Sequence, residues 1–295
     1  MSAPALGFVG FGEAAFHIAK GFKTAGIGCI CAFDINRDTP ELGKTIRRRA
    51  KEEQIPLVDS SNELAASAGI LFSTVTCTRA KEAAEQTAPF LKPHHIYVDL
   101  NSVSPSLKQE IEHVIHSSGA GFVEAAVMSP VPPHGHRVPM LLGGNAARRF
   151  AGRMEPFGMR LEVVSEKVGT AAATKMFRSI IVKGLEALML ESVLAASPYG
   201  ADERVFASLA DSFPGIDWKR LADYMVGRVV LHGERRAHEM EEVAETLRSL
   251  GIEPIMSEAA ARRQEWCAKL GIASEFGADG PKTYREVLEV IGRLT

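Results

Sequence analysis

Apolar residues recur in short runs along the first half of the chain, and each run is bounded by glycine, proline or polar residues. Runs of this kind predict buried strands, and helical patterns of apolar and polar residues stand between them. The predicted strands cover residues 6–10, 28–33, 69–75, 96–100, 122–126, 140–142 and 161–164, and the predicted helices cover residues 13–26, 63–68, 106–118 and 145–154. Strands that alternate with helices in this way predict a doubly wound, largely parallel sheet.

The second half of the chain has a different pattern, because from Gly169 onward it reads as helices almost exclusively. The stretch 169–197 is apolar on nearly every face and is long enough for about 40 Å of helix. A helix of this kind is buried on all sides, so we expect it to lie between domains or between subunits. The predicted fold class is therefore α/β, with a Rossmann-like sheet domain over residues 1–166 and an all-α domain over residues 167–295.

A glycine turn follows the first predicted strand and precedes the first predicted helix. It reads Gly-Phe-Gly-Glu-Ala-Ala over residues 10–15, which is the G-x-G-x-x-A pattern of a dinucleotide-binding turn. Asp34, at the end of the second strand, is placed to bind the adenosine ribose hydroxyls and to repel a 2′-phosphate, which favours NAD over NADP. Arg37 is the opposing signal, because an arginine there can bind a 2′-phosphate. The predicted cofactor-binding residues are Gly10, Phe11, Gly12, Glu13, Ala14, Asp34, Arg37 and Thr76.

A lysine inside the long apolar stretch is the candidate catalytic residue. Lys175, Ser179 and Lys183 are spaced by four residues and therefore share one helix face. Burial of an ammonium is costly unless it is paired or its pKa falls, and a lysine with a lowered pKa can accept a hydroxyl proton as hydride leaves carbon. The alternative is a lysine that extends from an interdomain helix to solvent and has no catalytic role.

Polar groups after one strand and on a later helix are candidate binding groups for an anionic substrate. Asn101 and Ser102 follow the carboxyl end of a strand, where open α/β sheets bind ligands. Arg235 and His238 share one face of the helix that carries the sequence HGERRAHEMEE. Either Arg235 or Arg236 clamps a carboxylate or phosphate there, or the face is solvated and held by ion pairs.

Four segments of the chain carry the motifs of one family. They are LGFVGFGEAAFHIAKGFKTAG, YVDLNSVSP, FVEAAVMSPVPPHGHRVPMLLGG and GTAAATKMFRS. In that order they resemble the opening segment, the D-x-S-T-x-x-P substrate motif, the third segment and the catalytic G-x-G-x-x-x-K-x-x-N-N helix of the β-hydroxyacid dehydrogenase superfamily, which includes 3-hydroxyisobutyrate and 6-phosphogluconate dehydrogenases. The likeness is greatest to a 6-phosphogluconate-dehydrogenase-like branch that has a short helical C-terminal domain.

The resemblance implies roles for residues outside the glycine turn. Lys175 and Ser179 are the implied catalytic residues, and the candidate substrate-binding residues are Asn101, Ser102, Met128, Ser129, Arg178, Arg235 and His238. Several positions depart from the family pattern, because Ser179 replaces an asparagine, Asn101 a serine, Met128-Ser129-Pro130 a Ser-Gly-Gly and His238-Glu239 a Lys-Asp pair. Since these departures concern the substrate side, no known substrate is transferred to this chain.

The composition excludes several classes of partner. A net charge of −2 at pH 7 gives no field to attract nucleic acid or an anionic membrane. The four cysteines form no C-x-x-C pair and the amino terminus has no charged signal region, so we expect reduced thiols in a cytoplasmic protein without a membrane span. His134 and His136 have no cysteine or carboxylate at ligand spacing, so we expect no metal. In the helical half, Trp218, Tyr224 and Trp266 either pack in the core or line a pocket.

These features together predict an NAD-dependent oxidoreductase, with NADP as the possible alternative cofactor. It transfers hydride between nicotinamide and a small β-hydroxy acid or related alcohol, and Lys175 is the general acid and base. We expect an anionic substrate in the cleft between the two domains, and the long apolar helix also predicts a homodimer. Two other functions stay open, an NADPH-dependent reductase of imines or keto acids and a non-catalytic dinucleotide-binding module.

Overall fold

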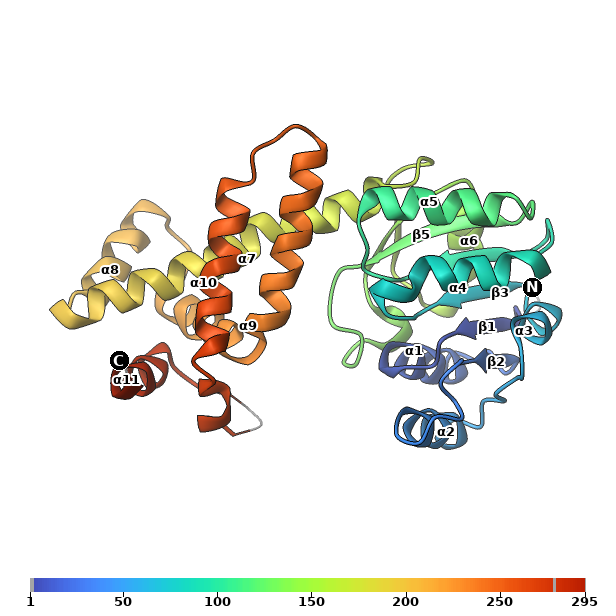
Figure 1. The fold of residues 1–295 in the computed structure, drawn as a ribbon, viewed down its shortest axis with the longest axis horizontal. Coiled ribbons are helices and arrows are strands. Elements are labelled where there is room, and N and C mark those ends of the chain that lie inside the picture. The colour runs from blue at the N-terminus through green and yellow to red at the C-terminus, as the bar shows by residue number, and fades with distance from the viewer. Residues whose placement is uncertain (1–2, 278–279, 295) are drawn as a thin grey trace. The chain divides into compact units, whose positions relative to one another are not determined.

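A computed structural model describes residues 3–277 and 280–294 of the 295-residue chain (Figure 1). The chain divides into two compact units, Met1–Lys175 and Met176–Thr295. The first residues of helix α7 (Thr170–Ala196) therefore belong to the first unit and the rest of that helix belongs to the second. The domain boundary predicted after residue 166 stays a prediction.

A sheet of seven strands forms the first unit. The strands are β1 (Leu6–Val9), β2 (Ile30–Phe33), β3 (Ile70–Ser73), β4 (Ile96–Asp99), β5 (Gly121–Val127), β6 (Met140–Gly143) and β7 (Leu161–Val163). Their order across the sheet is β2-β1-β3-β4-β5-β6-β7. The first five are parallel, β6 is antiparallel to β5, and β7 is parallel to β6. The predicted strands and the predicted doubly wound, largely parallel sheet are confirmed.

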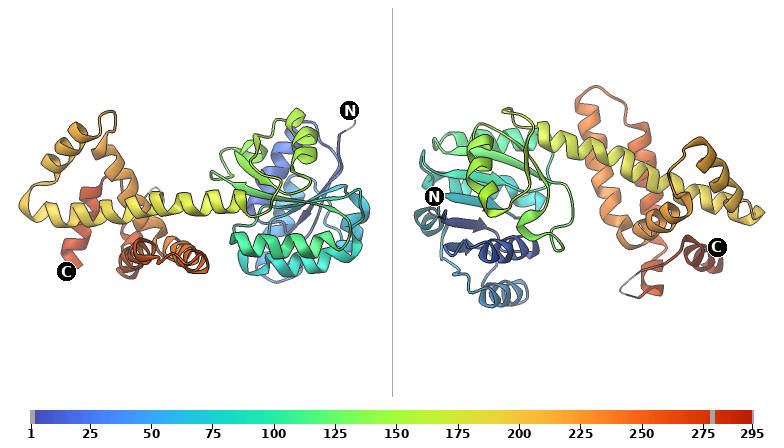
Figure 2. Two further views of the ribbon diagram at one scale, coloured as in Figure 1. Left: turned by 90° about the horizontal axis from the view of Figure 1, so that it is seen from above. Right: turned by 180° about the vertical axis from the view of Figure 1, so that it is seen from behind.

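Helices cover both faces of this sheet because successive strand side chains point to opposite faces. Phe8, Phe72 and Val98 pack in one core with α1 (Glu13–Thr24), α2 (Leu42–Glu52) and α6 (Ala147–Met154). Leu71 and Tyr97 pack in a second core with α3 (Ser61–Ser67), α4 (Ala80–Thr87) and α5 (Pro105–His116). Figure 2 shows these two helical layers on either side of the strands.

Two of these helices show what the sequence pattern did and did not reveal. Helix α5 begins as expected, with Pro105 in its first turn and the Ser104 hydroxyl accepting a hydrogen bond from the Leu107 N–H. Helix α4 was not predicted, because its alanine-rich sequence lacks a strong apolar period. It is short, and it is held by packing of Ala80, Ala83 and Ala84 in the second core.

The second unit consists of helices around a core of its own, as predicted. They are the remainder of α7, α8 (Asp202–Ser212), α9 (Trp218–Ser249), α10 (Ile255–Lys269) and α11 (Tyr284–Leu294). The core includes Leu190, Val226 and Tyr284, all fully buried. The Asp217 carboxylate caps α9 by accepting a hydrogen bond from the Arg220 N–H. No helix in the described part of the chain has both the length and the apolar character of a membrane span.

Helix α7 was expected to be buried between domains or between subunits, and one side of it is exposed in the single chain. Ile181, Leu185 and Leu188 have exposed fractions of 65%, 38% and 53%. Their spacings of four and three residues place them on one side of the helix, which is therefore an exposed apolar stripe. Leu190 and Val193, on another side, are buried in the helical core. A single chain thus covers the helix on part of its surface only.

Candidate functional site

The carboxyl ends of four neighbouring strands bring most of the predicted sheet-domain residues to one edge of the sheet. Strands β1, β3, β4 and β5 are parallel, so the loops that follow them lie along the same edge. These loops carry Gly10–Gly12 after β1, Thr74–Thr76 after β3, Asn101 and Ser102 after β4, and Met128 and Ser129 after β5. This edge is the candidate site.

The glycine turn has the shape that a pyrophosphate requires. Gly10 has a φ of +84°, and a Cβ there would lie 2.8 Å from the Val75 side chain and 3.0 Å from the Thr74 carbonyl oxygen. A Cβ on Gly12, by contrast, would meet no atom within 4 Å, so this position faces open space. Gly12 is the N-cap of α1, and the amides of Glu13 and Ala14 begin the helix without intrahelical acceptors. Space and free donors together fit a dinucleotide phosphate.

Asp34 joins the glycine turn to the end of β2. Its Oδ2 accepts a hydrogen bond from the Phe11 N–H at 2.7 Å, and its Oδ1 accepts one from the Asn36 N–H at 2.8 Å. The Phe11 side chain is fully buried in the core, and this packing stabilises the turn. A carboxylate held in this way beside the turn fits a ribose hydroxyl, which is a hydrogen-bond donor.

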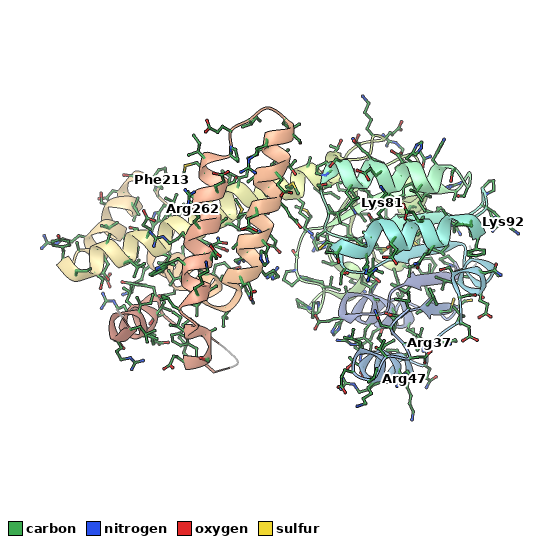
Figure 3. All side chains as sticks on the ribbon, viewed as in Figure 1. Arg37, Arg47, Lys81, Lys92, Phe213 and Arg262 are labelled. Atoms are coloured by element: carbon green, nitrogen blue, oxygen red, sulfur yellow. The ribbon has the colours of Figure 1, made fainter. Side chains whose placement is uncertain are left out.

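Arg37, the signal for NADP, is engaged elsewhere. Its guanidinium lies 2.5 Å from the Asp59 carboxylate and 3.1 Å from the Asp38 carboxylate, and it donates a hydrogen bond to the Val58 carbonyl at 2.9 Å. Hydrogen bonds to Asp59 and Asp38 raise its pKa. Arg47, in α2, donates a hydrogen bond to the Arg37 carbonyl oxygen, and Figure 3 labels both residues. Arg37 is thus paired with carboxylates in this structure, and its contact with the cofactor stays a prediction.

A threonine that the sequence did not single out fastens the turn to the neighbouring strand. The Thr74 hydroxyl donates a hydrogen bond to the Gly10 carbonyl at 2.8 Å. Thr76, the predicted cofactor-binding residue, is exposed just before a short 3-10 turn (Cys77–Arg79), and its hydroxyl lies 3.2 Å from that of Thr78. The cofactor role of Thr76 stays a prediction.

A buried network that the sequence did not reveal supports the loop after β4. The Lys108 ammonium donates hydrogen bonds to the Asp99 carbonyl oxygen and to its Oδ2, both at 2.8 Å. Lys108 and Asp99 have exposed fractions of 1% and 0%. The Asn101 side-chain amide donates to the Ser73 hydroxyl at 2.9 Å and to the Asp99 carboxylate. The donors of Asn101 are thus used inside the network, and its contact with substrate stays a prediction.

Lys175 lies at the same edge of the sheet. Its Nζ donates a hydrogen bond to the Ser102 hydroxyl at 2.8 Å, and Ser102 is exposed while Lys175 is half-buried. Both residues belong to the first unit. The structure therefore brings together the predicted catalytic lysine and a predicted substrate-binding serine, which are 73 positions apart in the chain.

The predicted site residues on the later helices belong to the second unit. Ser179 accepts a hydrogen bond from the Lys183 ammonium at 3.2 Å, and Lys183 pairs with Glu239 at 2.6 Å. Glu239 also accepts a hydrogen bond from Arg235 at 2.8 Å, so Arg235 is part of an ion-paired face. Arg178 and His238 are exposed, and their substrate contacts stay predictions.

The same helices contain a second, deeper ion pair. Arg236 lies 2.9 Å from the Glu186 carboxylate, and both side chains are almost fully buried. Burial raises the pKa of Glu186, and Arg236 opposes this change. Burial likewise lowers the pKa of Lys183, and the bond to Glu239 opposes it. Lys183, which shares the predicted helix face of Lys175, therefore has its charge compensated by Glu239.

Two other predicted groups have clear positions. The His136 Nε2 lies 3.0 Å from the Phe157 carbonyl oxygen and the residue is buried, so it anchors its loop. In residues 3–277 and 280–294, no three histidine, cysteine, aspartate or glutamate side chains are grouped to hold a metal. Trp218 and Trp266 pack against the helical core.

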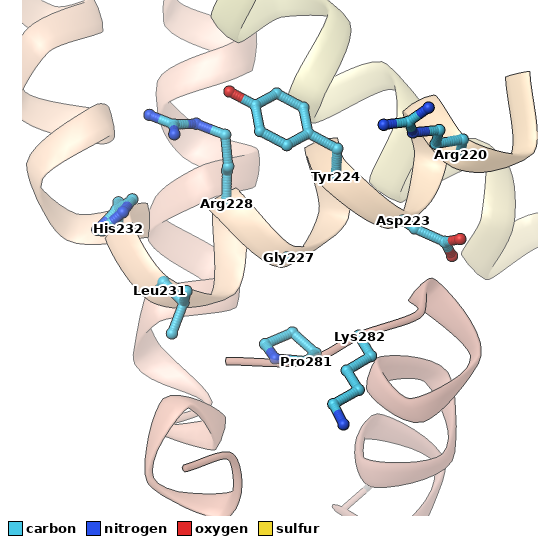
Figure 4. A pocket seen from close by; sticks show the side chains of 9 residues that line it. All are labelled: Arg220, Asp223, Tyr224, Gly227, Arg228, Leu231, His232, Pro281 and Lys282. Carbon is cyan, nitrogen blue, oxygen red and sulfur yellow. The ribbon is translucent and has the colours of Figure 1, made fainter. Parts of the chain in front are cut away.

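Tyr224 lines a pocket instead of packing in the core. It has an exposed fraction of 59%, and the Arg228 guanidinium lies 5.4 Å from its ring centre (Figure 4). The pocket has a volume of about 450 Å³ and is lined by Arg220, Asp223, Tyr224, Gly227, Arg228, Leu231, His232, Pro281 and Lys282. None of the predicted site residues lines it, and all of its lining residues belong to the second unit.

Two segments of the chain match known protein families. Residues 5–147 match the family described as the NAD binding domain of 6-phosphogluconate dehydrogenase, and residues 196–267 match a domain of unknown function, DUF1932. The structure is similar to that of a conserved hypothetical protein from Sinorhizobium meliloti 1021, with 36% identity over 99% of this chain and 97% of that chain and a TM-score of 0.83.

Two further relatives carry dehydrogenase descriptions. The conserved protein MTH1747 of unknown function is 28% identical over 90% of this chain and 97% of its own, with a TM-score of 0.77, and its structure is described as similar to 3-hydroxyacid dehydrogenases. The mitochondrial 3-hydroxyisobutyrate dehydrogenase of Drosophila melanogaster is 24% identical over 226 residues, which cover 72% of this chain and 64% of the fly protein. The resemblance inferred from the sequence motifs is confirmed.

Proposed function

We propose that this chain is an NAD-dependent dehydrogenase. It belongs to the family that joins a 6-phosphogluconate-dehydrogenase-like NAD-binding domain to a DUF1932 helical domain. Its substrate is a small β-hydroxy acid or a related alcohol. The observation that carries the proposal is the 2.8 Å hydrogen bond between Lys175 and Ser102. This contact lies at the same sheet edge as a glycine turn that fits a dinucleotide phosphate.

The chemistry requires one proton acceptor at this edge. The glycine turn and Asp34 would hold the dinucleotide, which would supply the acceptor for the hydride that leaves the substrate carbon. Lys175, with its amine neutral, accepts the hydroxyl proton at Nζ, and the carbon–oxygen bond becomes a carbonyl. In the reverse direction the Lys175 ammonium returns that proton to the carbonyl oxygen. The Ser102 hydroxyl orients the Lys175 Nζ. The buried pair of Asp99 and Lys108 stabilises the loop that carries Ser102.

An anionic substrate is supported by the charges next to the proposed base. Arg178 follows Lys175 by three residues and is exposed, so both lie on one side of α7. Ser129 follows β5 at the edge where Ser102 follows β4. Within the first unit, Lys175, Ser102 and Ser129 offer an ammonium and two hydroxyls to a carboxylate, and a contact of Arg178 with substrate stays a prediction. Lys175 also weighs against imine reduction, which needs no base for a hydroxyl proton.

A cytoplasmic location is part of the proposal. All four cysteines are free thiols, and Cys29 and Cys77 are exposed. Exposed thiols persist in the reducing cytoplasm, whereas oxidising compartments favour disulfides.

The direct test is a screen of hydroxy acids and alcohols, in which formation of reduced nicotinamide is followed by absorbance. We expect at least one small β-hydroxy acid to reduce NAD, and to do so faster than it reduces NADP. Binding of NAD without turnover on any hydroxy acid or alcohol would instead support the dinucleotide-binding module.

The choice of cofactor is tested by Asp34→Asn, which removes the charge but keeps a carbonyl oxygen for the turn. Loss of a charged hydrogen bond to the ribose is expected to raise the KM for NAD by about tenfold and to narrow the preference over NADP. Glu41→Gln is the matched control, because Glu41 is an exposed carboxylate that contacts only Lys44. An unchanged ratio of kcat/KM for the two cofactors would contradict the role of Asp34.

A homodimer is proposed from the apolar stripe on α7, formed by Ile181, Leu185 and Leu188. In a two-fold interface each substitution acts twice, so Leu188→Glu is expected to weaken self-association by at least about a hundredfold. Sedimentation velocity measures this change. Leu250→Glu is the control, because Leu250 is equally exposed but lies outside the stripe. A monomeric parent protein, or a dimer unaffected by Leu188→Glu, would contradict the proposal.

A further inference from the structure

One buried carboxylate of the sheet has no part in the chemistry described so far. Glu124 lies in β5, inside an otherwise apolar strand, and its exposed fraction is 0%. A buried carboxylate is costly unless it is compensated by charge or by hydrogen-bond donors. Backbone N–H groups supply this compensation, with three hydrogen bonds to the two carboxylate oxygens.

The donors are the first amides of helix α7. Glu124 Oε1 accepts hydrogen bonds from the Gly169 N–H at 2.8 Å and from the Ala171 N–H at 3.0 Å, and Oε2 accepts one from the Ala172 N–H at 3.4 Å. Amides at a helix N-terminus lack intrahelical acceptors and carry the positive end of the helix dipole. The Glu124 carboxylate, on strand β5, therefore caps helix α7, which carries Lys175.

The surrounding backbone leaves room for this carboxylate. Gly143, directly opposite Glu124 in the β5–β6 register, would place a Cβ only 2.3 Å from Glu124 Oε1. Gly169 has a φ of +109°, a conformation that L side chains rarely adopt. Both glycines thus permit the approach of Glu124 to the first turn of the helix.

The cap is connected to the proposed base by one helical turn. In an α-helix the N–H of residue i bonds to the carbonyl of residue i−4, so the Lys175 N–H bonds to the Ala171 carbonyl. The N–H of Ala171 is held by Glu124. Asp99 of β4 is the register partner of Glu124 in β5. The Asp99 carboxylate accepts a hydrogen bond from the Asn101 N–H and so supports the loop of Ser102. Glu124 therefore anchors the helix turn of Lys175, and its strand neighbour Asp99 anchors the loop of Ser102.

We propose that Glu124 is a positioning residue, which fixes the first turn of α7 and so holds the Lys175 ammonium against Ser102. This inference rests on the proposed function for its kinetic consequence, but not for its structural one. The carboxylate sets the rotation and the axial height of the helix at Lys175. A displacement of about 1 Å at a reacting group lowers turnover by up to about a hundredfold.

The kinetic test uses Glu124→Gln, which keeps the shape of the side chain. The amide nitrogen then faces an N–H donor, and the charge is lost. We expect kcat to fall by at least about tenfold, with the dissociation constant of NAD unchanged within about twofold, because the glycine turn lies elsewhere on the edge. Glu124→Asp retains the charge with a shorter reach, and we expect an intermediate kcat.

Two control variants separate positioning from a loss of stability. Glu166→Gln changes an exposed carboxylate that precedes the same helix and contacts only Arg148, and its kcat should be unchanged. Ile115→Val reduces packing in the core of the same unit without touching α7, so it shows whether lower stability alone affects kcat. A drop in kcat equal to that of Glu124→Gln in either control would overturn the inference.

A second measurement does not depend on turnover. Competitive acetylation followed by mass spectrometry reports the reactivity of each lysine, and Lys92 serves as the internal reference. In Glu124→Gln we expect the relative reactivity of Lys175 to change by at least about threefold, because its contact with Ser102 is loosened. Unchanged Lys175 reactivity would overturn the inference whether or not the protein is a dehydrogenase. If the parent protein turns over no hydroxy acid but the reactivity changes, the proposed function fails and the positioning role of Glu124 stands.

Discussion

Replacement of Lys175 by methionine is expected to lower kcat by about a hundredfold to ten-thousandfold, the contribution of a positioned general base. Methionine keeps the length of the side chain but cannot accept a proton. The dissociation constant of NAD should change by less than about twofold, because the glycine turn and Asp34, which are proposed to hold the dinucleotide, lie on other segments of the chain. Steady-state kinetics with the hydroxy acid found in the screen, together with calorimetric titration of NAD, measure the two effects separately.

Lys175→Arg distinguishes a base from a charge that merely binds an anion. Arginine keeps the positive charge and can donate to Ser102, but it does not lose its proton at neutral pH. If Lys175 is the base, the arginine variant should be as impaired as the methionine variant. If Lys175 only attracts a carboxylate, arginine should retain most of the activity. Lys167→Met, at an exposed lysine before the same helix, should leave kcat unchanged.

The largest expected effect on stability is that of Lys108→Met, which leaves the Asp99 carboxylate buried without its cation. Loss of one partner from a buried ion pair costs about 3–5 kcal/mol in the free energy of unfolding. Urea-induced unfolding measures the change. The expected cost is large because Lys108 also bonds the Asp99 carbonyl oxygen, so the methionine variant orphans two acceptors.

A surface pair in the same unit provides the comparison. Lys81 and Glu110 are 2.7 Å apart, but about half of each side chain is exposed, so Lys81→Met should cost less than about 1 kcal/mol. Adding Asp99→Asn to Lys108→Met should restore part of the lost stability, because a neutral amide replaces the uncompensated charge. Equal changes in the free energy of unfolding for Lys108→Met and Lys81→Met would show that the buried pair contributes no more to stability than the surface pair.

Much of the sheet domain is predictable because its signals are local. Leu6–Val9 is apolar and is followed by a glycine pair and a helical period, so strand, turn and helix are each determined within a few residues. The position of Asp34 beside the turn follows from the strand order of the βαβ unit. The edge that gathers Ser102 and Ser129 is predictable for the same reason, since parallel strands end together.

The buried charges were not predicted, although each left a signal. Lys108 shares a helix face with Ile111 and Ile115, and all three are buried in α5. A lysine in line with isoleucines indicates burial, but its partner Asp99 is on another element, so only the tertiary fold identifies the pair. Glu124 interrupts an apolar strand in the same way. Its partners are backbone amides, which no side-chain pattern in the sequence reveals.

Helix α7 was predicted to be buried between domains or between subunits, and the sequence does not distinguish these two cases. Apolar residues around its whole circumference show that it avoids water, but not which molecule covers it. Leu190 is covered by helices of its own chain, whereas Leu188 is exposed. A sequence cannot separate burial within a chain from burial in an assembly, because both remove apolar surface from water.

The loop between β5 and β6 is held at both ends, and the residues at its tip are exposed although the His134 N–H bonds the Val131 carbonyl. Met128 N–H bonds the Pro139 carbonyl at one end, and buried His136 is held by Phe157 at the other, while residues 132–134 are exposed. Sequence changes confined to that tip therefore carry little folding penalty and leave the strands on either side in place. These three positions can therefore be varied without disturbing the contact of Lys175, the proposed base, with Ser102, because both residues are anchored on other segments.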